Sequence, residues 1–264
     1  MDIKFNLRPG KIVVIELFGK IGGSIKSPIY EKLIERLRKD KSCKALVLDI
    51  DSPGGTVTDS EYLYHVLCKF GLEKPIVSNI RGLGASGAYL LACAGRKIVA
   101  SPGSIVGSIG VISIRPVVEE LLKKAGIDIN VTKTGIYKDM GAYWRATSNE
   151  EEIKLQSFVD ESYKRFVEVV VKSRSLPEAD VQKLANGEVF WGSGALKNGM
   201  VDKLGTLDTS IDMAAELANC KRKVVTLGPK RSLLQKITGS LSASLVDSTV
   251  NELENRIWSD HVRY

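Results

Sequence analysis

Short apolar runs alternate with amphipathic segments along the chain, and this alternation limits the possible folds more than any other feature. The runs "KIVVIELFG" (11–19), "KALVLDI" (44–50) and "KPIVSNI" (74–80) have the composition of buried strands. Between them, residues 27–40 and about 58–70 carry apolar side chains at helical spacing. Strands that alternate with helices predict an α/β fold with a largely parallel sheet.

The middle of the chain continues the same pattern. "KIVAS" (97–101), "GVISI" (110–114) and "DINVTKT" (128–134) are predicted strands, and "VVEELLKKAG" (117–126) is a predicted helix between the last two. A long amphipathic helix is predicted from Asn149 to about Ser173, with Ser148 or Asn149 as its N-cap.

The domain organisation follows from the absence of an internal repeat or a Pro- or Gly-rich linker. We predict one domain over residues 1–230 and a C-terminal helical extension over 231–264. The extension carries apolar residues at mostly helical spacing. They fit packing against the domain or a neighbouring subunit, with an interfacial membrane helix as the alternative. They are Leu241, Leu245, Val250, Leu253 and Ile257.

Composition excludes several classes of function. The net charge of +7 comes from 38 Lys and Arg against 31 Asp and Glu that are interspersed with them, and no nucleic-acid-binding motif is present. We therefore expect a solvated basic surface and no nucleic-acid partner. The four cysteines form no CxxC pair, which favours free thiols over disulfides or a zinc site. No cofactor is expected. No signal peptide and no membrane-spanning run is visible, so a cytoplasmic location is expected, with peripheral membrane contact left open.

A glycine-rich turn follows the second predicted strand, in "DIDSPGGTV" (49–57). A strand that ends in Ser-Pro-Gly-Gly and enters a helix leaves backbone N–H groups that can hold an anion or an oxyanion. A plain tight turn is the alternative. The patterns of a phosphate loop and of a dinucleotide-binding loop are both absent.

The stretch "RGLGASGAYLLACAG" (81–95) places Ser86 between small residues at the start of a predicted helix. Such a turn presents a hydroxyl as a nucleophile elbow does. A nucleophilic serine needs a base, but His65 lies mid-helix and His261 lies near the chain end, where neither is well suited. A lysine held away from water is the remaining option, and composition does not choose among the lysines.

Four motifs in order resemble those of the signal peptide peptidase A (SppA) family, over about residues 11–218. They are "DSPGG", "GASGAY", "SPGSIVGSIGVI" and "TKTGIYKDMGAYWRATSNEEE". The resemblance implies a Clp protease/crotonase-like fold of repeated ββα units. It also implies a serine endopeptidase with a Ser-Lys dyad, which cleaves signal-peptide remnants or unfolded apolar peptides through an acyl-enzyme intermediate.

Carried over by position, the resemblance makes Ser86 the nucleophile and Lys138 the general base. The backbone N–H groups of Gly55 and Gly87 would form the oxyanion hole. Ser108 falls where the family has a serine that bonds the lysine amine, with a simple strand-end hydroxyl as the alternative. Thr56 and Ala88 replace family glycines, and "AYWRATS" replaces a run that contains Ser-Pro, which leaves substrate preference open.

The resemblance also implies assembly. In SppA-type peptidases the serine and the lysine come from different protomers of a ring, commonly an octamer, so a homo-oligomer with shared active sites is expected here. Three other functions are kept open at this point: a Clp-type peptidase with a Ser-His-Asp triad, a crotonase-like acyl-CoA enzyme that does not need Ser86, and an inactive scaffold.

Overall fold

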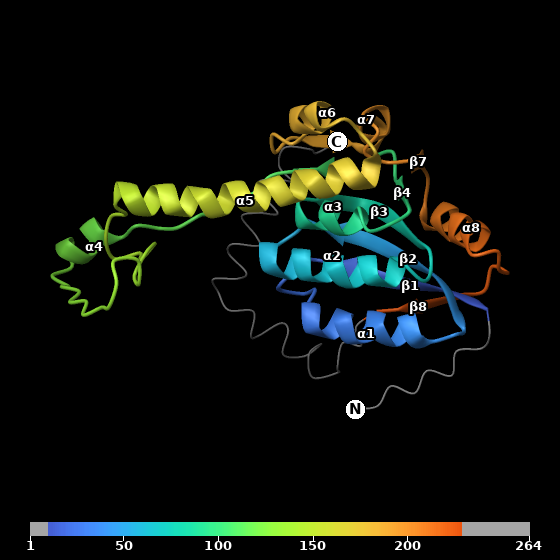
Figure 1. The fold of residues 1–264 in the computed structure, drawn as a ribbon, viewed down its shortest axis with the longest axis horizontal. Helices are drawn as coiled ribbons and strands as arrows, with labels where there is room; N and C mark the ends of the chain where they lie inside the picture. Colours follow the sequence, from blue (N-terminus) through green and yellow to red (C-terminus); the bar gives the residue numbers. More distant parts are fainter. Residues whose placement is uncertain (1–9, 229–264) are drawn as a thin grey trace. The chain divides into compact units, whose positions relative to one another are not determined.

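Three long apolar strands form the centre of one sheet in the computed structural model, which describes residues 10–228 (Figure 1). They are β1 (Lys11–Phe18), β2 (Cys43–Ser52) and β3 (Ile76–Ala85). β1 pairs in parallel with β2, and β2 pairs in parallel with β3. The predicted α/β fold with a mostly parallel sheet is confirmed, and its central strands lie where the sequence predicts them.

Shorter strands extend this sheet on both sides. The first half of β3 pairs with β4 (Lys97–Ala100) and the second half with β5 (Ile105–Gly107), both in parallel. β8 (Val224–Leu227) pairs in parallel with β1, and β7 (Lys203–Leu204) with β4. β6 (Val189–Trp191) runs antiparallel to β5.

Helices cover both faces of the sheet, as the apolar character of the strands on both sides requires. On one face, Val13, Ile15 and Leu46 belong to a core that also includes buried side chains of α1 (Ser27–Lys39), α2 (Val57–Gly71) and α3 (Gly87–Ala92). On the other face, Ile12 and Val47 pack with side chains of α8 (Leu207–Leu217). Two further helices are short: α6 (Glu178–Leu184) and α7 (Gly192–Lys197).

Helix α5 (Asn149–Arg174) has two different halves. Its carboxyl-terminal half packs on the core through Phe166, Val167 and Val170, whereas its amino-terminal half extends beyond the sheet (Figure 1). The segment 111–148, which we name the arm, lies at that far end and contains α4 (Glu119–Lys124). Ser148 caps α5 in a capping box with Glu151, as one of the two predicted caps.

Two predicted strands are wrong. Residues 110–114 and 128–134 adopt no strand in the structure, although α4 forms between them within the predicted helix. Both segments lie outside the sheet, and a strand needs a neighbour to take its backbone hydrogen bonds. Their apolar side chains stand in solvent instead: Ile112 and Ile114 are 81% and 82% exposed.

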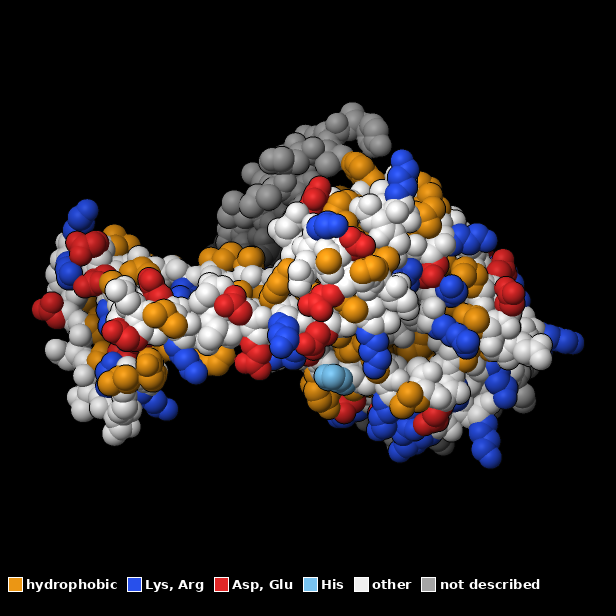
Figure 2. All heavy atoms as spheres, turned by 45° about the horizontal axis from the view of Figure 1, so that its top comes forward, with side chains coloured by type: hydrophobic (Ala, Val, Ile, Leu, Met, Phe, Trp, Pro, Cys, Tyr) orange, Lys and Arg blue, Asp and Glu red, His pale blue; other side chains and the backbone are white. Residues whose placement is uncertain are grey.

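The arm carries an unusual number of exposed large apolar side chains (Figure 2). They are Ile112, Ile114, Val117, Leu121, Ile127, Ile129, Val131, Ile136, Tyr137 and Tyr143. An exposed apolar surface of this extent is typical of a protein–protein interface.

Two further predictions concern the ends of the chain and the membrane. The predicted helical extension 231–264, with His261, lies outside the described residues. Among residues 10–228, no helix combines the length and the apolar composition that a membrane span requires.

Candidate active site

Ser86 lies at the junction of β3 and α3 in a strained backbone conformation. Its φ of 53° and ψ of −127° are unusual for any residue other than glycine. The conformation is held by two backbone hydrogen bonds. The Ser86 N–H donates to the Gly107 carbonyl of β5 (2.8 Å), and the Ser86 carbonyl accepts from the Leu90 N–H (3.1 Å). A strained strand-to-helix turn of this kind is the geometry of a nucleophile elbow.

The glycine-rich turn after β2 packs directly against this elbow. Gly54 has a φ of 93°, and a Cβ there would stand 2.7 Å from the Gly87 nitrogen and 2.9 Å from the Ser86 Cβ. A Cβ on Gly55 would overlap the carbonyl oxygen of Ile21. Glycine is therefore required at both positions, because any side chain would push the turn away from Ser86.

The two glycines predicted for the oxyanion hole lie close together at this contact. The place that a Cβ of Gly87 would occupy is 3.6 Å from the Gly55 nitrogen. Gly55 and Ile21 form an isolated β-bridge. The two hydrogen bonds of this bridge run from the Ile21 N–H to the Gly54 carbonyl and from the Thr56 N–H to the Ile21 carbonyl, so neither uses the Gly55 N–H. The bridge thus leaves the Gly55 N–H for a ligand.

The sheet explains why segments that are 30 residues apart meet. β2 and β3 are parallel, so the turn after β2 and the elbow after β3 leave the same edge of the sheet. Their register changes between Ile50 and Ser52, where Ser52 comes to lie opposite Gly84. The Asp51 carboxylate accepts a hydrogen bond from the Leu83 N–H at this irregularity (3.0 Å), which ties the two strand ends together.

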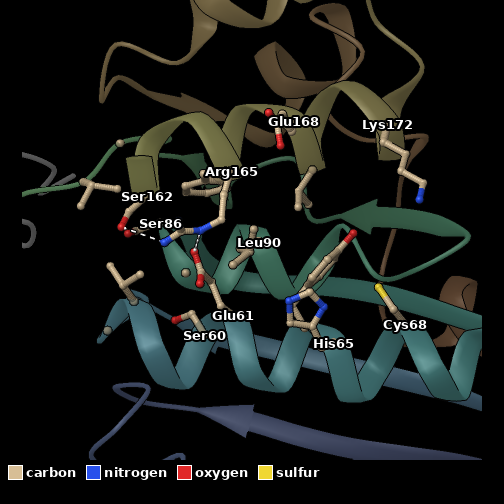
Figure 3. Close-up of a pocket in the computed structure, with 18 residues that line it drawn as sticks. Ser60, Glu61, His65, Cys68, Ser86, Leu90, Ser162, Arg165, Glu168 and Lys172 are labelled. Atoms are coloured by element: carbon tan, nitrogen blue, oxygen red, sulfur yellow. Dashed lines mark hydrogen bonds and ion pairs between the residues drawn. The ribbon is translucent and has the colours of Figure 1, made fainter. Parts of the chain in front are cut away.

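A pocket of about 390 Å³ opens beside Ser86, Gly55 and Gly87, between α2 and α5 (Figure 3). Part of its wall is apolar, with Leu90 and Phe166 among the lining residues. An ion pair between Glu61 of α2 and Arg165 of α5 (2.9 Å) joins its two sides. This arrangement can hold a peptide segment with an apolar side chain against the elbow.

His65 also lines this pocket, which the sequence did not indicate, but no contact joins it to Ser86 among the described residues. Its ring packs edge-on to Tyr64, with the centroids 5.8 Å apart. The Ser-His arrangement of a Clp-type triad is therefore not formed by the described part of this chain.

Ser108 directly follows β5, the strand whose last residue binds the Ser86 backbone. Its φ is 50°, and its N–H donates to the Glu188 carbonyl (2.7 Å). The preceding residue, Gly107, supplies the carbonyl that binds the Ser86 N–H. Ser108 is thus one residue from a direct backbone contact with the nucleophile.

Lys138 belongs to the arm, which lies at the end of α5 that extends beyond the sheet (Figure 1). It is exposed, and it is not among the described residues that line the pocket. One copy of the chain therefore brings Ser86, Gly55 and Gly87 together but does not bring Lys138 to them.

An ion-pair network fixes the backbone next to Lys138. Arg145 donates two hydrogen bonds of 2.9 Å to the Asp139 carboxylate and another, of 2.8 Å, to Glu151 at the start of α5. Hydrogen bonds from Arg145 and from the Ser148 backbone lower the pKa of Glu151 to about 2. Arg145 and Lys133 hold the pKa of Asp139 well below its ordinary range.

We predict that the arm keeps its local structure in mild acid. The carboxyls of Asp139 and Glu151 have lower pKa values in the folded arm than the ordinary values near 4. Their contribution to stability is therefore complete above about pH 4 and is lost as the pH falls toward 2. Trp144 emission, measured with Trp191 and Trp258 replaced by Phe, should stay constant from pH 7 to about pH 4. A transition centred above pH 5 would contradict this.

The comparisons with known proteins agree with this geometry. The sequence profile of Peptidase family S49 matches residues 70–221, and that of Clp protease matches residues 11–106. The chain belongs to peptidase family S49. The S49 match contains the Ser86 elbow and the arm, and the Clp protease match contains the glycine-rich turn. The chain is thus a protease of this family, and the resemblance to SppA is confirmed.

Three relatives illustrate the similarity of this S49 chain to other proteins. A candidate protease of Synechocystis sp. is 36% identical over 87% of this chain and 83% of its own length. A candidate signal peptide peptidase SppA of Enterococcus faecium is 32% identical, over 76% and 62% respectively. The chloroplastic serine protease SPPA of Arabidopsis thaliana is 31% identical over 92% of this chain, which spans 38% of that longer protein.

Proposed function

We propose that this chain is a serine endopeptidase with a Ser-Lys dyad, in which Ser86 is the nucleophile and Lys138 of a neighbouring copy is the general base. The observation that carries the proposal is the strained Ser86 turn, with the Gly55 and Gly87 N–H groups beside it. Membership of family S49 supports the same assignment.

The proposed reaction starts when an uncharged Lys138 amine takes the Ser86 proton as the hydroxyl attacks a peptide carbonyl. The N–H groups of Gly55 and Gly87 stabilise the negative charge on the carbonyl oxygen. Lys138 then gives the proton to the leaving amine, and a water molecule hydrolyses the acyl-enzyme. Ser108 is proposed to orient the lysine, since it lies next to the strand end that holds the Ser86 backbone.

The proposal that the dyad forms between copies is supported by the arm. Lys138 lies among exposed apolar side chains of the arm and far from Ser86 in its own chain. A lysine amine acts as a base only when uncharged, and burial away from water lowers the pKa of such an amine. A second copy packed on the arm would supply that burial. We therefore propose a homo-oligomer, with the octameric ring of the SppA family as the first arrangement to test.

The proposed substrates are signal-peptide remnants or unfolded apolar peptides. The support is the partly apolar pocket beside Ser86, whose volume of about 390 Å³ accommodates a few side chains rather than a folded protein. No nucleic-acid partner is proposed, and the location of the protein in the cell is proposed to be the cytoplasm.

Labelling with a fluorophosphonate tests the proposed nucleophile. The wild-type assembly should become labelled on Ser86 and should cleave fluorogenic peptides, whereas Ser86→Ala should do neither. A crotonase-like enzyme or a scaffold would give an unlabelled wild-type protein. Retention of near-normal peptidase activity by Lys138→Ala would contradict the lysine base and would favour a different one.

A further inference from the structure

The hydroxyl of Ser60 is buried beside the predicted oxyanion hole and has no hydrogen-bond partner among residues 10–228. Ser60 lies in the first turns of α2, is 2% exposed and lines the pocket that contains Ser86 (Figure 3). Its Oγ is one of the buried side-chain atoms of the described residues that make no hydrogen bond. Its backbone is anchored, because the Ser60 N–H donates to the Thr56 carbonyl (3.1 Å). A buried hydroxyl without a partner is costly unless a ligand completes its hydrogen bonding.

The position of this hydroxyl relates it to both predicted oxyanion donors. A Cβ built on Gly87 would overlap the Ser60 Oγ, and the same point lies 3.6 Å from the Gly55 nitrogen. The Ser60 hydroxyl therefore packs against the Gly87 backbone, close to the Gly55 N–H. Ser86 precedes Gly87 and lines the same pocket as Ser60, so a molecule bound to Ser86 is the candidate ligand for this hydroxyl.

We propose that Ser60 is a further catalytic residue, whose hydroxyl donates a third hydrogen bond to the substrate carbonyl oxygen as negative charge develops on it. The inference rests on the proposed peptidase function. The hydroxyl is suited to this role because it is shielded from water and is held on a helix that directly follows the glycine-rich turn. Oxyanion donors aimed from rigid elements act mainly on kcat, since the charge they stabilise exists only in the transition state.

The alternative role of Ser60 is packing against Gly87, and alanine distinguishes the two. Ser60→Ala keeps the small side chain and removes only the hydroxyl. The experiment measures kcat and KM for a fluorogenic peptide with the assembled protein, and the affinity of a peptide aldehyde, which forms a tetrahedral adduct with a nucleophilic serine. We expect kcat to fall by about 10- to 100-fold, with KM within about twofold of the wild-type value and aldehyde affinity reduced in parallel.

Ser42→Ala is the matched control. The Ser42 hydroxyl is also buried and finds no hydrogen-bond partner in the described part of the chain, but it lies in the turn between α1 and β2, outside the pocket. Its removal should leave kcat, KM and aldehyde affinity unchanged. Ser60→Cys is a second variant that keeps a weak donor of similar size, and its kcat should fall between those of wild type and Ser60→Ala.

The outcomes separate this inference from the function on which it rests. If wild type is labelled by fluorophosphonate and Ser60→Ala retains kcat within twofold, Ser60 has only a packing role. The proposed peptidase function then stands, while the proposal for Ser60 fails. A rise in KM at unchanged kcat would also overturn it, because it would show ground-state binding. If wild type is neither labelled nor active, the peptidase function fails and the role of Ser60 with it.

Discussion

A mixture of two inactive variants, Ser86→Ala and Lys138→Ala, is expected to recover about a quarter of wild-type activity once their subunits have exchanged, as in a ring whose sites each join two neighbours. Each variant alone should lose about 10⁴-fold or more in kcat, as removal of a nucleophile or its base does elsewhere. In the mixture, a site is intact where the serine of a Lys138→Ala subunit faces the lysine of a Ser86→Ala subunit. The recovery follows from the separation of the two residues within one chain.

The measurement is peptide hydrolysis after the differently tagged variants are co-expressed and purified through both tags. The double variant Ser86→Ala/Lys138→Ala, co-expressed with either single variant, is the control and should recover nothing. No recovery from the two single variants, in particles that are shown to contain both, would mean that the base comes from the same chain as Ser86.

Replacement of Gly55 by alanine should cost both activity and stability. The new Cβ would overlap the Ile21 carbonyl oxygen, and it would also lie within 2.8 Å of the Ile21 nitrogen. Both are backbone atoms, so the turn itself must move. We expect Gly55→Ala to reduce kcat by about 100-fold, as loss of an oxyanion donor does. Unfolding should require about 1–3 kcal/mol less free energy, which is typical of overpacking.

Gly103→Ala provides the control for this prediction. A Cβ on Gly103 would meet nothing within 4 Å, so stability and kcat should stay near the wild-type values. Chemical denaturation and peptide hydrolysis measure both effects. A Gly55→Ala variant with wild-type kcat would remove Gly55 from the oxyanion hole, whatever happens to its stability.

The sequence predicts the sheet well because its strands are buried on both faces. Such strands are short apolar runs that need no information from distant residues, as β1 and β2 illustrate. The Ser86 elbow and the glycine-rich turn are also local, since each is specified by small residues between a strand and a helix. Their encounter follows from the parallel pairing of β2 and β3.

The arm shows where sequence reasoning fails and why. Residues 110–114 and 128–134 have the apolar composition of strands, but nothing in the described chain lies beside them to complete a sheet. Periodicity reports that a segment has an apolar side and does not report what covers it. The proposed lysine base has the same difficulty, because the spacing of lysines along the chain does not show how close any amine lies to Ser86.

Ser60 was missed for a different reason. A serine in "VTDSEYLYHVL" indicates only a weak helix former, and the sequence does not show that its hydroxyl is enclosed. Its placement depends on the contact of α2 with Gly87, which only the three-dimensional structure displays. The available signal was positional, since Ser60 follows Thr56, the helix cap, by a single turn.

Helix α5 is one unbroken rod of 26 residues, about 39 Å long at the rise of an α-helix. One end carries the arm, and the other supplies Arg165 and Phe166 to the wall of the pocket beside Ser86. A rod without a hinge transmits a tilt from one end to the other. In the proposed assembly, a neighbour attached at the arm would act on the same rigid helix that lines the pocket, which would couple quaternary contacts to substrate selection.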